Sequence, residues 1–95
     1  MASFTLGPWT ATEAVDRNHM SSVDAGARCI ALVGASDMDE QNANAQLISA
    51  APELYASALV ALDYLDTPAS AHSAGQLELI VQTLRDSLAK ARGEA

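Results

Sequence analysis

The hydrophobic pattern of the chain changes at Gly34, and this change constrains the fold more than any other feature. Before Gly34, short apolar stretches are separated by turn residues, and the last of them, Arg28–Val33, is typical of a strand. After Gly34, apolar residues recur at the three- and four-residue spacings of helices. Strands followed by helices predict an α+β domain in which a small three-stranded antiparallel sheet packs against two to three helices.

The N-terminal half contains three stretches that could be strands: Trp9–Val15, His19–Val23 and Arg28–Val33. We expect Trp9 to fill the core between sheet and helices, because an aromatic ring covers a large area. Cys29 lies within the last and most apolar stretch, where a thiol packs as a small hydrophobe. An exposed edge position, which would allow an intermolecular disulfide, stays open as the alternative.

The C-terminal half shows clear helix start and stop signals. Asp37 followed by Glu40 fits a capping box, and a helix is expected through 42–51. Pro52 then either kinks the helix or splits it in two, because proline has no amide hydrogen to donate. The last helix is expected over Ser73–Arg92, with Gly93 just past its end.

Two of the predicted helices carry an apolar stripe that is expected to face a core. The stripes contain Leu54, Tyr55, Ala58, Leu59, Leu62 and Leu65 in one helix, and Leu77, Ile80, Val81, Leu84, Leu88 and Ala91 in the last. We expect one domain over residues 1–95, with strands in about 1–34 and helices in about 37–92. Twenty alanines against only twenty Leu, Ile, Val and Phe predict a small core, so a homodimer would add useful burial.

Charge excludes some partners. Five basic residues against twelve acidic ones, a net charge of −7, argue against direct binding to nucleic acid or to an anionic membrane surface. The segment 37–66 has no Lys or Arg, and its acids either keep the surface solvated or form an acidic face for a basic partner. The residues of this predicted acidic face are Asp37, Asp39, Glu40, Glu53, Asp63 and Asp66.

No set of residues has the pattern of a catalytic, cofactor or metal site. The stretch 30–36 enters a turn like a phosphate-binding loop, but acids follow where further glycines are needed. Cys29, His19 and His72 have no spacing typical of nucleophilic catalysis, and both histidines lie in polar segments where they should be exposed. One Cys and two separated His do not make a closed zinc site. We therefore expect a protein that is not an enzyme and that uses neither cofactor nor metal.

Three patches carry a resemblance to known proteins. Leu6–Trp9, Ile30–Val33 and 42–54 resemble, in this order, a group of small phage and prophage proteins of unknown function. Members of that group begin with "GPW", continue through weak strands to an Ile-Ala-x-Val-like run, and then read "ANARLIAAAPELL". Gln46 stands here where the group commonly has arginine, and Tyr55 where it has an aliphatic residue.

The resemblance implies a phage or mobile-element origin. Small acidic phage proteins commonly act by binding host machinery. We therefore expect a non-catalytic protein that binds and inhibits a host defence complex in the bacterial cytoplasm, as anti-CRISPR proteins do. Its acidic face would then contact the basic, nucleic-acid-binding surface of a complex such as a CRISPR effector. The alternative is a phage accessory or adaptor protein that acts through helix-mediated oligomerisation.

Overall fold

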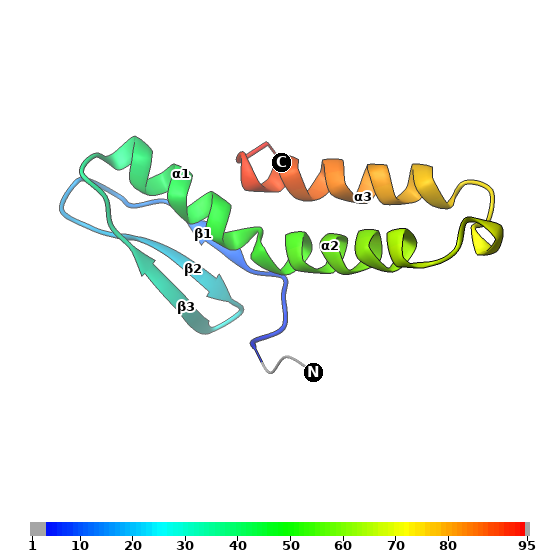
Figure 1. Cartoon of the computed structure of the whole chain (residues 1–95). Coiled ribbons are helices and arrows are strands. Elements are labelled where there is room, and N and C mark those ends of the chain that lie inside the picture. Colours follow the sequence, from blue (N-terminus) through cyan, green and yellow to red (C-terminus); the bar gives the residue numbers. More distant parts are fainter. Residues whose placement is uncertain (1–3, 95) are drawn as a thin grey trace.

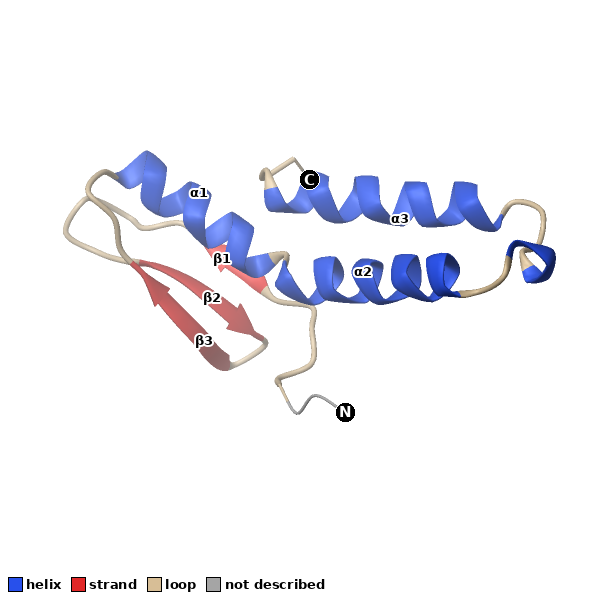
Figure 2. Cartoon of the chain, viewed as in Figure 1, coloured by secondary structure: helices blue, strands red, loops and turns tan. Residues whose placement is uncertain are grey.

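A computed structural model describes residues 4–94 of the chain, and its N-terminal part is a three-stranded sheet (Figures 1 and 2). The strand order is β1-β2-β3 and both pairings are antiparallel. Ala11 lies opposite Val23, which lies opposite Ala31, and the β2–β3 pairing becomes irregular just after Val23. The strands are β1 (Thr10–Thr12), β2 (Ser21–Ala25) and β3 (Arg28–Val33).

Helix α1 (Met38–Ser49) lies across one face of this sheet and forms the core with it. Val23, Val33 and Ala45 are buried at the contact. Trp9 is half-buried and packs against this cluster, as expected from the sequence.

Polar side chains also fasten α1 to the sheet. Gln41 Nε2 donates to the His19 carbonyl oxygen at 2.9 Å and to Ser21 Oγ at 3.2 Å. Asn42 Oδ1 accepts from Ser21 Oγ and from the Ala14 amide. These bonds satisfy polar groups that would otherwise be buried without partners. They explain why α1 packs on the sheet although it has few large apolar residues.

Helices α2 (Ala51–Asp66) and α3 (Gln76–Ala91) form an antiparallel hairpin that extends away from the sheet (Figure 1). Ala50 is both the C-cap of α1 and the N-cap of α2, so the chain splits into two helices at this point, bent by 45°. Pro52 lies in the first turn of α2, where its missing amide hydrogen costs no helical bond. A short 3₁₀ turn, Ala69–Ala71, lies in the loop between the two helices.

The fold class and several local signals are confirmed. The sheet precedes the helices, as the change of pattern at Gly34 predicts. Asp37 caps α1 by accepting from the Glu40 amide at 2.7 Å. Gly93 follows α3 with a φ of 77°, a left-handed conformation that favours glycine.

Three sequence expectations on the sheet half and the hairpin tip are wrong, and one open alternative is decided. The first strand is limited to 10–12, and Val15 beyond it is exposed. Cys29 takes the exposed alternative and not the buried one, because β3 is an edge strand whose first residues extend beyond the cover of α1. The middle strand begins two residues later than expected, at Ser21. His72 is half-buried, since its ring stacks on Tyr64 at 3.9 Å between centroids.

The α2 stripe does not face a core as the sequence analysis expected. Most of its large members are exposed, because α1 already covers the sheet and α2 packs mainly against α3. The molecule is consequently elongated, with extents of 56 × 26 × 19 Å and a radius of gyration of 16.1 Å. A compact chain of this length would have a radius of gyration of about 12 Å.

Candidate interaction surface

The contact between α2 and α3 is made mainly by small or polar side chains. At its centre, Ser57 Oγ and Ser87 Oγ lie 2.6 Å apart and both residues are buried. Ser87 Oγ also lies within hydrogen-bond distance of the Thr83 and Glu53 carbonyl oxygens, at 2.9 and 3.2 Å. Small side chains let the two helices approach closely, but they bury little apolar area. The contact rows, defined by heptad spacing and burial, are Ala50, Leu54, Ser57, Ala61 and Tyr64 on α2 and its N-cap, and Gln76, Ile80, Thr83, Ser87 and Lys90 on α3.

Lys90 joins three parts of the chain. Its Nζ lies 2.7 and 2.9 Å from the two carboxylate oxygens of Glu53 on α2. The same Nζ donates to the Trp9 carbonyl oxygen at 2.9 Å, just before β1. The end of α3 is thereby fixed to the start of α2 and to the sheet half.

Each contact residue is followed along the chain by an apolar residue. In two antiparallel helices, the positions that come one residue after the contact rows lie on the same side of the pair, because both helices turn right-handed while running in opposite directions. All ten such positions are apolar here, and we call them the apolar face. The apolar face consists of Ala51, Tyr55, Ala58, Leu62 and Leu65 on α2, and Leu77, Val81, Leu84, Leu88 and Ala91 on α3.

Most of the large side chains of this face are exposed to solvent, while Val81 and Leu84 are half-buried. Leu62 is 61% exposed, Leu65 77% and Leu77 54%. The other side of the hairpin differs in character, because charged and amide side chains alternate with apolar ones there. Its positions, one residue before the contact rows, include Glu53, Ala56, Val60 and Asp63 on α2, and Leu79, Gln82, Asp86 and Ala89 on α3.

Aromatic residues extend the apolar face toward the N-terminal segment. The rings of Phe4 and Tyr55 pack edge to face with centroids 5.1 Å apart. A hollow of about 350 Å³ lies beside them, lined by Phe4, Trp9, Ala51, Pro52 and Tyr55. An apolar surface that continues over two helices and a hollow is typical of a protein interaction site.

The residues of the predicted acidic face do not lie on one surface. Asp37, Asp39 and Glu40 lie together at the start of α1. Asp63 and Asp66 lie in the last turn of α2, at the other end of the molecule (Figure 1). The Glu53 carboxylate, between them, pairs with Lys90.

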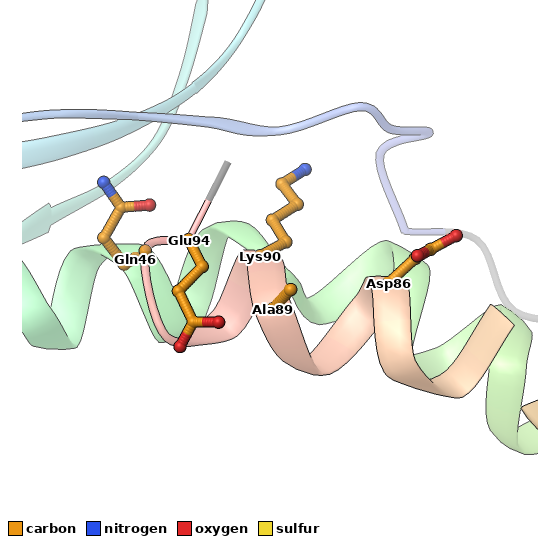
Figure 3. A pocket seen from close by; sticks show the side chains of 6 residues that line it. Gln46, Asp86, Ala89, Lys90 and Glu94 are labelled. Carbon is orange, nitrogen blue, oxygen red and sulfur yellow. The ribbon is translucent and has the colours of Figure 1, made fainter. Parts of the chain in front are cut away.

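A second hollow, of about 480 Å³, lies where the end of α3 meets α1. Figure 3 shows its polar side chains pointing apart: Lys90 and Glu94 extend in different directions, and Gln46 and Asp86 lie at opposite sides. The Lys90 ammonium is engaged outside the hollow, with Glu53 and Trp9. The polar groups therefore do not converge on one point, as a small-molecule site requires.

The remaining sequence candidates stay apart from one another. Among residues 4–94, no three His, Cys, Asp or Glu side chains lie close enough together to hold a metal ion. His19 contacts Asp16 at 2.7 Å, and this hydrogen bond, with a second one from the Asn18 amide, lowers the pKa of the Asp16 carboxyl.

Between residues 4 and 94, no single helix is long and apolar enough to cross a membrane, although α1 and α2 taken together, with their 45° bend, reach that length and composition.

Comparison with known families gives a match that covers the whole chain. Residues 1–95 match the model of the family described as Salmonella phage P22 protein Y8K6. The chain belongs to this phage protein family. Comparison with curated proteins and with solved structures gives no match.

Membership in the Y8K6 family confirms that this is a phage protein, as the resemblance implied. Sequence analysis found most residues of the apolar face but placed them in a core. The signal that could have corrected this is a comparison of two neighbouring rows on each helix. The contact rows contain several polar residues, whereas all ten positions that come one residue later are apolar.

Proposed function

We propose that this phage protein is a non-catalytic adaptor that acts by binding protein through the apolar face of its α2–α3 hairpin. The main support for the proposal is the composition of that face, in which all ten positions are apolar and most of the large side chains are exposed. Monomeric soluble proteins rarely expose a continuous apolar surface of this kind. Of the two functions that the sequence suggested, the geometry favours the accessory or adaptor protein.

The contact between α2 and α3 supports the same proposal. In a hairpin that binds no partner, leucines are expected between the helices and serines on the outer surface. Here Ser57 and Ser87 are buried between the helices, while Leu62 and Leu77 are outside. Hydrogen bonds and the close approach of small side chains thus contribute to holding the hairpin together, which leaves most of its leucines exposed for a partner.

A capture experiment from phage-infected host cells tests the proposal. Tagged wild-type protein is compared with the variant Leu62→Glu/Leu77→Glu, which places two charges on the apolar face. The matched control is Val60→Glu/Leu79→Glu, which places the same charges on the same two helices, at residues 49% and 68% exposed on the other side.

We expect mass spectrometry to identify virion or replication proteins bound by the wild type and by the control, and lost from the face variant. Equal recovery of these proteins by all three forms would contradict a role for the apolar face.

The second candidate function is inhibition of a host defence complex, such as a CRISPR effector, through acidic residues. It is favoured by Asp37, Asp39 and Glu40, which are exposed together at the start of α1. Arg17 lines a hollow beside Asp37 without forming an ion pair with it. A basic, nucleic-acid-binding surface would be attracted by these carboxylates in a salt-dependent way.

Charge reversal separates this candidate from the adaptor. Asp39→Lys should release a captured effector complex, and a high-salt wash should do the same to the wild type. Glu78→Lys, which changes an exposed acid at the start of α3, is the control. Asp37 is left unchanged because it caps α1. An effector complex retained by Asp39→Lys, or one resistant to salt, would contradict the electrostatic mechanism.

A further inference from the structure

We propose that the apolar face is covered by a second copy of this chain, so that two hairpins form a symmetric four-helix assembly. This inference rests on the proposed function, because it names a second copy of the chain as a protein that the apolar face binds. An interface between identical chains is self-complementary about a two-fold axis. The apolar face meets this requirement in area, in charge and in shape.

The area argument starts from the surface of the isolated chain, which is 6670 Å². A compact monomer of 9.9 kDa exposes about 5,200 Å². The difference is about 1,500 Å² on each copy, and a standard stable interface buries about 800 Å² from each partner. A second copy on the apolar face would therefore remove about half of the excess surface.

The charge argument concerns the net charge of −7 on each copy. Two copies repel one another over most of their surface, so a dimer is stable only where the contact itself is uncharged. The apolar face contains no charged residue in its ten positions. The other side of the hairpin contains Glu53, Asp63 and Asp86, so it is the less suitable side for a second copy.

The shape argument follows from the pairing of Ser57 with Ser87, which sets the relative height of the two helices. At that height, Ala58 on α2 lies between the levels of Leu84 and Leu88 on α3. A two-fold axis parallel to the hairpin keeps every residue at its own height and places α2 of one copy over α3 of the other. Ala58 of each copy then receives the leucines of its partner, a large side chain against a small one.

Light scattering coupled to gel filtration tests this inference on the purified full chain from about 1 to about 100 µM. We expect the wild type to have twice the mass of 9.9 kDa at the upper concentrations. Leu62→Glu/Leu77→Glu should reduce the mass twofold, to that of one chain, and Val60→Glu/Leu79→Glu should leave the dimer intact. Circular dichroism checks that each variant is folded, and Leu62→Gln/Leu77→Gln, which introduces no charge, replaces the first variant where it is not.

The outcomes of the experiment distinguish a failure of the dimer from a failure of the proposed function. A wild type of single-chain mass at every concentration overturns the inference, and so does a dimer that is lost in the control but kept in the face variant. The proposed function fails separately, because it depends on the capture of phage proteins. A monomeric wild type whose capture of those proteins still requires Leu62 and Leu77 would remove the second copy and keep the adaptor.

Discussion

Ser57 and Ser87 are single positions at which substitutions should change the stability of the protein measurably. Their hydroxyl groups meet between α2 and α3, where both residues are buried. We expect Ser57→Ala to lower the free energy of unfolding by about 1 kcal/mol, because Ser87 keeps its bond to the Thr83 carbonyl. Ser57→Leu should lower it by about 2–3 kcal/mol, since the larger side chain forces the helices apart. Urea denaturation measures both, and a Leu variant as stable as the Ala variant would show that the helices are not closely packed here.

The contact between Asp16 and His19 gives a second prediction at the scale of single residues. Because the hydrogen bond from His19 lowers the pKa of Asp16, the contact stabilises the fold above the ordinary aspartate pKa and is lost as the pH falls through the lowered value. His19→Ala should therefore raise the pKa of Asp16 toward its usual value, as measured by an NMR titration of its carboxyl carbon. Arg17→Ala is the control, and an unchanged pKa in His19→Ala would show that the contact does not form in solution.

At the scale of elements, the sequence identified two helix-capping residues, although the expected bounds of 42–51 and 73–92 differ from the observed α1 and α3, and it did not identify which side of α2 is buried. The Asp37 cap and the glycine after α3 depend on neighbouring residues, so they can be derived locally. Which side of α2 is buried depends on how many elements pack against it, and periodicity does not contain that number. The expectation that Leu62 and Leu65 face a core was wrong for this reason.

The candidate sites show the same limit. The six acids were grouped because no Lys or Arg lies between them in the sequence, but the bend at Ala50 and the length of α2 separate them in space. The ion pair of Glu53 with Lys90 could not be predicted from the sequence either, because 37 positions separate the two residues along the chain.

The start of α2 provides a prediction about how elements join. A Cβ added at Gly7 would lie 2.9 Å from the Cβ of Pro52, closer than two carbon atoms normally approach. Gly7→Ala should therefore destabilise the protein by about 1–2 kcal/mol, because the proline ring in the first turn of α2 is rigid. Gly34→Ala is the matched control, since its added Cβ would meet Met20 at an ordinary 3.7 Å. Equal thermal midpoints for the two variants would contradict the close packing of the N-terminal segment on α2.

At the scale of the whole molecule, Lys90 is expected to make the sheet half and the hairpin unfold together. Trp9 fluorescence reports on the sheet half, and circular dichroism reports mainly on the helices. We expect the two signals to change at one denaturant concentration, as they do when a single domain unfolds cooperatively. In Lys90→Ala, which loses the bonds to Glu53 and Trp9, stability should fall by about 1 kcal/mol and the two transitions should begin to separate.

Arg85→Ala, which removes an exposed cation from the same helix, is the control for this experiment. Two separate transitions already in the wild type would contradict the expectation of one domain.

The bond from Lys90 to the Trp9 carbonyl also has a consequence for biosynthesis. The two residues are 81 positions apart, so the N-terminal segment waits for its last partner until α3 has been synthesised. During translation, the strands and α1 can pair with one another as soon as they leave the ribosome, because their contacts are close in sequence. The contact row of α2 has no partner helix in that interval. The nascent chain is therefore most exposed to chaperones and to premature association just before its final helix emerges.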